Sequence, residues 1–299
     1  MRAVITDPDA PHGMRMGTVP EPEPAPDETV VEVRHAGVNH GDLRTDARPP
    51  GTVLGADAAG IVVRAAADGT GPAAGTRVMA LAPGAWAERV AVPAGALAEV
   101  AAAVDLADAA AVPLAGITAL RNLPAPLAGR RVLITGASGG VGRMAVQLAA
   151  RGGAHVIAAV GSAERGAGLD ALGAAEVVVG LDGVTEPVDL VLDNVGGPLL
   201  VAAWNLLAPG GDLRSIGWAS GEPAVLPPYA TFALGPARTL HSFGDVTDLA
   251  ADLAELASLH ASGAITAGVA WRAPWDRAAD AATALATRRI AGKAVLDVT

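Results

Sequence analysis

The sequence predicts an α/β protein in which a small β-barrel precedes a doubly wound parallel sheet. The first third of the chain contains short apolar strands separated by glycine and proline turns, as small barrels do. From about Val112 onward strands alternate with helices, which is typical of a parallel sheet covered on both faces. Of the 299 residues 51% are hydrophobic and 17% charged, so each part can bury a core.

The first part is built from strands that recur at short intervals. We expect strands at Ala3–Thr6, Thr29–Arg34, Arg77–Ala80 and Ala87–Val92. The second of these alternates as TVVEVR, which indicates a half-buried strand. The run PEPEPAP at Pro20–Pro26 should form an extended loop, because proline removes a backbone donor and restricts φ.

The second part contains six predicted strands with helices between them, a number that suits the doubly wound fold. The strands are Arg131–Thr135, His155–Val160, Glu176–Val179, Leu190–Asp193, Asp212–Ile216 and Thr239–Phe243. The helices are Gly140–Arg151, Ala163–Leu172, Leu199–Leu207 and Val246–Ser262. The last segment has the pattern strand, helix, strand, and we expect its final strand to return to the first part. The predicted domains are therefore residues 1–112 with 264–299, and residues 113–263.

Charge and composition exclude several classes of protein. The net charge is −10 and Lys293 is the single lysine, so nucleic-acid binding is not expected. The absence of cysteine excludes disulfides, thiolate zinc sites and cysteine nucleophiles. The N-terminus lacks an apolar core of signal-peptide length, and the most apolar stretch, Ala101–Leu120, is broken by acidic residues and a proline. We therefore expect a soluble, cytoplasmic protein without a membrane span.

The strongest local signal is a glycine-rich turn between a predicted strand and a predicted helix, in RVLITGASGGVGRMAVQLA. Ala137-x-Gly139-x-x-Gly142 matches the dinucleotide fingerprint with alanine at the first glycine. Gly139 leaves the backbone open to a pyrophosphate, Gly142 permits close packing, and the helix N-terminus offers free N–H groups. The expected cofactor contacts are Gly136, Ser138, Gly139, Gly140 and Val141. A tight turn that binds no ligand is the alternative.

The end of the next strand bears on the choice between NAD and NADP. Gly161 stands where an acidic residue would hold the ribose 2′-hydroxyl of NAD. Ser162 and Arg165 could instead contact a 2′-phosphate, the first by a hydrogen bond and the second by charge, although Glu164 opposes this. This pattern favours NADPH. Alternatively, Ser162 caps the following helix and Arg165 is a solvated surface charge.

Several segments, taken in order and together with this turn, resemble the medium-chain dehydrogenase/reductase superfamily. They are MRAV (1–4), VVEVRHAGVNHGDLR (30–44), GADAAGIVV (55–63), GTRVMAL (75–81), GAWAERVAVP (84–93), AAAVPLAGITAL (109–120), DLVLDNVGG (189–197), LLAPGGDLRSIG (206–217) and GKAVLDV (292–298). The resemblance implies a GroES-like β-barrel domain and a Rossmann domain with hydride transfer between them. It also implies a homodimer formed through the edge of the Rossmann sheet.

The zinc enzymes of this superfamily differ from the chain at their ligand positions. Asn39 stands where they carry a cysteine, and Ala56 stands where they carry a histidine. His40 and Asp57 alone do not make a zinc site, which needs about three protein ligands, so no metal is expected. The chain thus resembles the zinc-free quinone oxidoreductase and enoyl reductase branch. That resemblance implies hydride transfer from NADPH to a quinone or an α,β-unsaturated carbonyl, a small-molecule substrate.

The resemblance supplies two candidate catalytic residues. Asn39 would face the nicotinamide or the substrate carbonyl, or it serves only as a structural hydrogen-bonding residue. His40 is the titratable group beside it, and a surface or supporting role is the alternative. Asp42 is expected to stabilise the local turn. Relatives carry a tyrosine two residues after this aspartate, whereas this chain has Arg44, which puts the usual proton donor in doubt and hints at an anionic substrate.

Further cofactor contacts are expected near the ends of the sheet strands. Thr118 matches a threonine that lies near the nicotinamide in the family. Asn194 follows the fourth strand, and Gly217 and Trp218 follow the fifth, where such sheets bind ligands. Trp218 could also be a packing residue. The family's tyrosine for the 2′-phosphate is missing near Gly180.

Two other functions stay open at this point. The chain could bind NADPH without turnover, as a sensor or regulatory protein, since the tyrosine is replaced by Arg44. A zinc alcohol dehydrogenase is the third interpretation, and its ligand set is incomplete.

Overall fold

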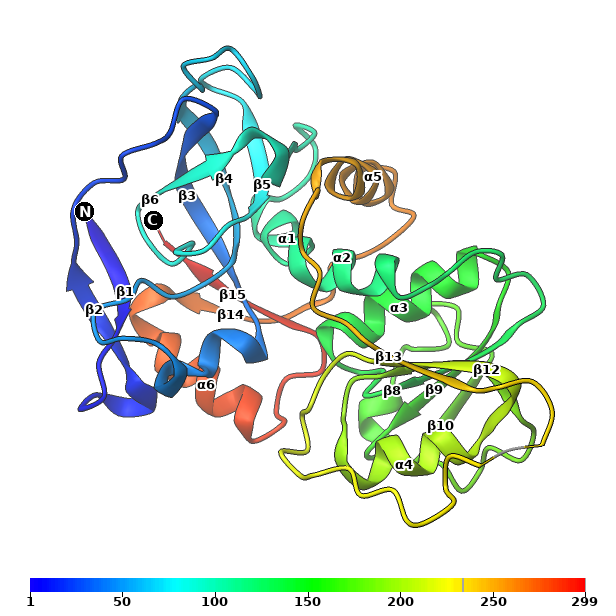
Figure 1. The fold of residues 1–299 in the computed structure, drawn as a ribbon. Helices are drawn as coiled ribbons and strands as arrows, with labels where there is room; N and C mark the ends of the chain where they lie inside the picture. Colours follow the sequence, from blue (N-terminus) through cyan, green and yellow to red (C-terminus); the bar gives the residue numbers. More distant parts are fainter. Residues whose placement is uncertain (233, 299) are drawn as a thin grey trace. The chain divides into compact units, whose positions relative to one another are not determined.

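The computed structural model describes residues 1–232 and 234–298 and contains two compact units (Figure 1). The first unit joins residues 1–117 to residues 246–298, and the second holds residues 118–245. The chain therefore leaves the first unit, builds the second and returns, as the sequence predicts. The α/β class is confirmed.

The first unit is built on a seven-stranded sheet and a two-stranded sheet. The larger sheet has the order β14-β15-β3-β4-β5-β7, and β6 pairs with β3. Its pairs are antiparallel except for β14 with β15. The strands are β1 (Arg2–Thr6), β2 (Met14–Thr18), β3 (Glu28–Val38), β4 (Asp57–Arg64), β5 (Arg77–Leu81), β6 (Arg89–Pro93), β7 (Leu97–Glu99), β14 (Val269–Pro274) and β15 (Lys293–Asp297). The return strand β15 pairs with β3, which confirms the expected return of the chain end.

Strand β3 shows why this sequence folds as a sheet. Val31 and Val33 are fully buried, whereas Glu32 and Arg34, which alternate with them, are part-exposed and form an ion pair. This alternation puts the apolar side chains on the core face. Trp86 fills the same core and donates its ring N–H to the backbone oxygen of Gly37 at 3.0 Å.

Helices cover parts of this unit. They are α1 (Leu106–Ala110), the first residues of α2 (Pro113–Arg121), α5 (Ala250–Ala261) and α6 (Ala278–Ala286), with short 3₁₀ turns between elements. Helix α5 packs against β7 and the turn at residues 94–96. The first unit resumes at residue 246, whereas the sequence places the domain boundary at 263, and Leu256 of α5 packs on Gly116 within the first unit.

The second unit is the predicted doubly wound sheet. Its six strands are all parallel in the order β10-β9-β8-β11-β12-β13, which is the strand order of the dinucleotide-binding fold. The strands are β8 (Arg131–Thr135), β9 (His155–Val160), β10 (Glu176–Val179), β11 (Val188–Asp193), β12 (Leu207–Ser215) and β13 (Thr239–Ser242). Helices α3 (Gly140–Arg151) and α4 (Gly197–Asn205) lie on opposite faces of this sheet (Figure 1).

One predicted helix of this unit is wrong. The segment 163–172 forms only a 3₁₀ turn at Glu164–Gly166 followed by turns. Gly168 adopts a φ of +75°, a left-handed conformation that ends a helix. The helix predicted from Val246 also begins later, at Ala250. The first error arises because the alanine-containing segment has high helix propensity whatever its tertiary packing, and the helix of the second starts late because Asp248 adopts a left-handed φ of +49°.

Candidate functional site

A polar cluster forms in the first unit where strand β3 ends and the neighbouring strands β4 and β15 begin. In the register of the sheet, Ala294 of β15 faces Val38 of β3, and Gly37 faces Asp57 of β4. Lys293, at the start of β15, is thereby brought opposite the residue that follows β3. These three strands are far apart in the sequence, so only the sheet brings their polar ends together.

Asn39 stands at the centre of this cluster. Its side-chain Nδ2 donates to Asp57 Oδ2 at 3.0 Å and to Asp42 Oδ2 at 3.3 Å. Its Oδ1 accepts from Lys293 Nζ at 2.6 Å. Asp42 Oδ2 also accepts the backbone N–H of Asn39 at 2.8 Å, which confirms that Asp42 stabilises this turn. Both amide hydrogens of Asn39 thus point to carboxylates.

Asp57 and Lys293 form a buried ion pair beneath Asn39. Lys293 Nζ lies 3.1 Å from Asp57 Oδ2, and the two side chains are 3% and 0% exposed. Asp57 Oδ1 accepts the backbone N–H of Leu114 at 2.8 Å, in the first turn of α2. Gly37 makes room for this carboxylate, since a Cβ there would lie 2.8 Å from Asp57 Cβ. The one feature of the sequence that singles out this ion pair is that Lys293 is the only lysine.

Burial changes the protonation of the groups around this cluster. Burial of Asp42, with the nearby negative charge of Asp57, raises the pKa of Asp42 to about 6, although Asn39 and Lys293 oppose the shift. The ring of His40 is at the surface, yet neighbouring protein removes part of its hydration. This desolvation and the positive charges of Lys293 and Arg288 lower the pKa of His40, which favours the neutral imidazole.

The second unit contains the predicted phosphate-binding turn between β8 and α3. Gly136 has a φ of +60°, and the residue that caps α3 is Gly139, which has no side chain to occupy the free N–H groups. A Cβ on Gly142 would lie 2.6 Å from Ala137 Cα, so only glycine lets the helix approach the turn this closely. The expected strand, turn and helix are therefore present, and Gly140 and Val141 open the helix.

Two of the predicted cofactor residues contact each other at this turn. Arg165 Nε donates to Ser138 Oγ at 3.0 Å, and Ser138 is buried. The backbone N–H of Arg165 donates to the carbonyl oxygen of Ser162 at 3.2 Å. The alternative role of Ser162 as a helix cap does not apply, because the short turn that follows is capped by Ala163. Arg165 is thus held beside the glycine turn and is not a freely solvated charge.

Asn194 lies in a second network of the same unit. Its Nδ2 donates to the backbone oxygen of Thr135 at 2.9 Å, and its N–H donates to Thr135 Oγ1 at 3.0 Å. Thr135 Oγ1 in turn donates to Asp193 Oδ1 at 2.6 Å. Burial raises the pKa of Asp193, while this bond and the N–H of Gly196 stabilise its charged form. Thr135 and Asp193 look like ordinary strand ends in the sequence, which carries no signal of this network.

Gly217 and Trp218 lie next to Asn194 at the carboxyl ends of the strands. A Cβ on Gly217 would lie 2.7 Å from the carbonyl oxygen of Asn194. Trp218 packs against Gly196, yet 52% of its surface is exposed. Thr118 is buried in α2, where its carbonyl oxygen accepts from Asn122 Nδ2 at 2.8 Å. The structure therefore gathers three of these four residues, and it places Thr118 on the helix.

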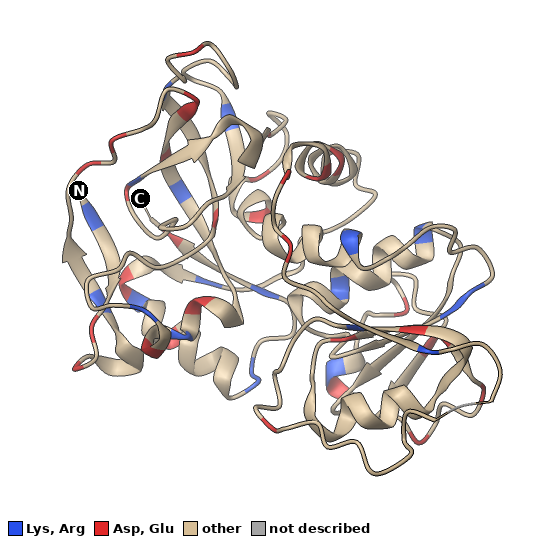
Figure 2. Ribbon diagram, in the orientation of Figure 1, with Lys and Arg blue, Asp and Glu red and all other residues tan. Residues whose placement is uncertain are grey.

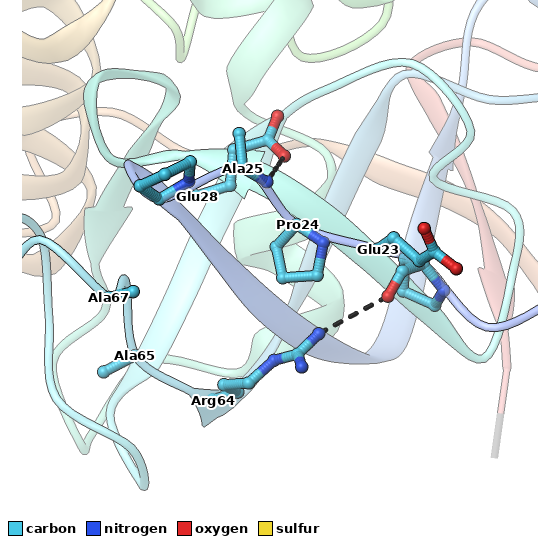
Figure 3. A pocket seen from close by; sticks show the side chains of 9 residues that line it. Glu23, Pro24, Ala25, Glu28, Arg64, Ala65 and Ala67 are labelled. Carbon is cyan, nitrogen blue, oxygen red and sulfur yellow. Dashed lines mark hydrogen bonds between the residues drawn. The ribbon is translucent and has the colours of Figure 1, made fainter.

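Among the described residues, the charged surface and the shallow pocket do not bring buried polar groups together as these clusters do. Figure 2 shows acidic and basic residues spread over both units. A shallow pocket lies between the proline-rich segment and the end of β4, but Arg64 donates to Pro22 O and Ala25 N–H donates to Glu28 (Figure 3). Within residues 1–232 and 234–298, no helix is long and apolar enough to cross a membrane. In the same residues, no three histidine or carboxylate side chains gather as a metal site would require.

Comparison with known proteins identifies the family of the chain. A family model described as an alcohol dehydrogenase GroES-like domain matches residues 25–102, and one described as a zinc-binding dehydrogenase matches residues 170–296. The structure of the Escherichia coli quinone oxidoreductase complexed with NADPH superposes with a TM-score of 0.89 at 26% identity, covering 99% of this chain and 100% of that chain. The chain belongs to the medium-chain dehydrogenase/reductase superfamily. Within this superfamily it falls in the quinone oxidoreductase and enoyl reductase branch.

Curated relatives in this superfamily are similar over most of the chain. Erythronolide synthase EryA2 of Saccharopolyspora erythraea is 38% identical over 248 residues, which are 72% of this chain but 7% of the synthase. Prostaglandin reductase-3 of Bos taurus is 32% identical over 248 residues, 76% of this chain and 65% of the reductase. The chain therefore spans a small part of the synthase and about two thirds of the reductase.

Proposed function

We propose that this medium-chain dehydrogenase/reductase is an NADPH-dependent enzyme that transfers hydride to a quinone or an α,β-unsaturated carbonyl compound without a metal ion. The observation that carries the proposal is the glycine turn, beside which Arg165 is held by a hydrogen bond to Ser138. The complex of the similar Escherichia coli quinone oxidoreductase with NADPH and the match to a prostaglandin reductase support it.

The second unit fits the phosphates of a dinucleotide. The N-terminus of α3 offers backbone N–H groups and the positive end of a helix dipole. Gly161 at the end of β9 is exposed, and a Cβ there would meet nothing within 4 Å, so the place of an acidic residue is open space. Arg165 would supply the positive charge for a 2′-phosphate. When bound, NADPH supplies the hydride.

A metal-free site is supported by how the carboxylates of the first unit are used. Asp57 stands in the segment that carries ligands in the zinc enzymes. Its Oδ2 is within 3.1 Å of Lys293 Nζ, which already neutralises the carboxylate. Ala56 and Asn39 provide no metal ligand of the usual kind. The ammonium group therefore neutralises Asp57 without a metal cation.

The chain's own residues suggest a division of work during reduction of an enone or quinone. Hydride addition makes the carbonyl oxygen negative, and such an oxygen is stabilised by hydrogen-bond donors. Asn39 is not available as this donor, since both its amide hydrogens point to carboxylates. His40 retains a neutral ring with one N–H at neutral pH, because its pKa is lowered, so we assign it as the candidate donor.

The decisive experiment follows NADPH absorbance while purified protein is mixed with a panel of quinones and enones, with NADH in parallel. We expect oxidation of NADPH in clear excess over NADH with at least one acceptor. The best acceptor then separates a quinone reductase from an enoyl reductase. Tight NADPH binding without oxidation by any acceptor would favour a sensor instead. Failure to bind NADPH would refute the interpretation of the glycine turn as a phosphate-binding site.

We also propose that the protein forms a homodimer through the edge of the parallel sheet. The edge strand β13 is exposed at all four residues, including Leu240 at 47%. Exposed edges with apolar side chains tend to pair with another chain. Leu240→Asp should convert a dimer to a monomer in light scattering after size-exclusion chromatography, while exposed Val225→Asp serves as a control for added charge. A wild-type protein that elutes as a monomer would refute the proposal.

A further inference from the structure

We propose that Lys293 is a positioning residue for hydride transfer, holding the amide of Asn39 in a single orientation through its place between Asn39 and Asp57. The kinetic consequences of this role rest on the proposed function, whereas the orientation of the Asn39 amide does not depend on any substrate.

The hydrogen bonds around Asn39 leave its amide only one orientation. If the amide were flipped, its NH₂ group would face the ammonium of Lys293, and its oxygen would face Asp57 and Asp42. Donor would then face donor at Lys293, and acceptor would face acceptor at the two carboxylates. In the observed orientation Oδ1 accepts from Lys293 and has one further lone pair. Asn39 therefore offers a ligand an acceptor and not a donor.

The choice of lysine at this position goes against the composition of the chain. The other 20 basic residues are arginines, and Lys293 is the one exception. A guanidinium is planar and larger, whereas an ammonium is a compact charge that fits between two close acceptors. Here the acceptors are Asn39 Oδ1 at 2.6 Å and Asp57 Oδ2 at 3.1 Å, at a side chain that is 3% exposed. These contacts fit the compact ammonium of lysine.

The ammonium also balances the charge of the cluster. Asp42 and Asp57 are both buried and both accept from the same amide nitrogen of Asn39. Lys293 contacts Asp57 directly and lowers the pKa of Asp42 through its charge, and Arg48 donates to the backbone oxygen of Asp42 at 3.4 Å. Without the ammonium the two carboxylates would repel each other, and Asn39 would lose the partner of its oxygen.

The kinetic test compares Lys293→Met with the double variant Asp57→Asn/Lys293→Met. Lys293→Met should lower kcat for the best acceptor about 10- to 100-fold, the loss expected for a charged hydrogen bond, while the Kd for NADPH changes less than about twofold. The double variant removes both charges, so it should recover thermal stability. It should not recover kcat, because Asn39 still lacks its partner. Recovery of both stability and kcat would show that the ion pair of Asp57 and Lys293 has only a structural role, and this would overturn the proposal.

A second readout does not depend on turnover. The chain has four asparagines, so labelling with ¹⁵N-asparagine gives few side-chain amide signals, and Asn39→Ala identifies the signal of interest. We expect the two Nδ2 hydrogens of Asn39 to exchange slowly in the wild type and at least about tenfold faster in both variants that lack Lys293. Arg277→Met, which breaks an exposed ion pair with Asp280, should leave them unchanged.

The two arms separate failure of the inference from failure of the proposed function. If none of the tested acceptors supports oxidation of NADPH by the wild-type protein, the proposed reaction is refuted. The amide signals still decide whether Lys293 orients Asn39. Unchanged Asn39 amide exchange in Lys293→Met refutes the positioning role even in an active enzyme.

Discussion

Gly142→Ala should disturb the phosphate-binding turn more than any other single methyl group added there. A Cβ at Gly142 would lie 2.6 Å from Ala137 Cα and 2.8 Å from Ala137 C, and closer still to the carbonyl oxygen of Gly136. These are backbone atoms, which cannot rotate away as a side chain can, so α3 must move from the turn. Overpacking of this kind costs about 1–3 kcal/mol. The Tm should fall by roughly 3–10 °C.

Displacement of α3 also moves the N–H groups that would bind phosphate. Loss of one charge-assisted hydrogen bond corresponds to an increase of about tenfold or more in the Kd for NADPH. Circular dichroism measures the Tm, and quenching of intrinsic fluorescence measures the Kd. Gly244→Ala is the matched control, because a Cβ there meets nothing within 4 Å at an exposed position of the same unit. Unchanged Tm and Kd in Gly142→Ala would show that the close packing is not needed.

Three further predictions concern single side chains. Arg165→Gln should raise the Kd for NADPH about tenfold but leave that for NADH within about twofold, as measured by fluorescence titration; equal losses would contradict a 2′-phosphate contact. Burial raises the pKa of Asp42 to about 6, above its value of about 4 in the unfolded chain. Ionisation of Asp42 therefore destabilises the fold, and the free energy of unfolding should fall by roughly 3 kcal/mol as the pH rises from about 4 through 6. Asp42→Asn should abolish this slope in urea unfolding whereas exposed Asp46→Asn retains it, and a persisting slope would exclude Asp42 as its source. Thr135→Val should lower the free energy of unfolding by about 2–4 kcal/mol, since the hydroxyl that donates to buried Asp193 is lost; Thr135→Ser is the control, and equal loss in both would point to packing instead.

The glycine turn was predictable because its determinants are local. Gly136, Gly139 and Gly142 lie within seven residues, between an apolar strand and an amphipathic helix, and each meets a steric need of the backbone. The helix predicted at 163–172 failed for the opposite reason. Alanine and leucine favour a helix there, but the glycines and the packing of β9 and β10 allow only turns.

The sequence by itself determined the class of the fold, the parallel sheet, the return of the last strand and the residues of the phosphate-binding turn, because hydrophobic periodicity and glycine spacing act over a few residues. Only the tertiary structure decided what Asn39 does. Its partners Asp57 and Lys293 are 18 and 254 residues away, and the register of β15, β3 and β4 brings them together. Strand register depends on pairings across the whole sheet, so a catalytic candidate read from the sequence becomes, in the structure, an acceptor fixed by a buried lysine.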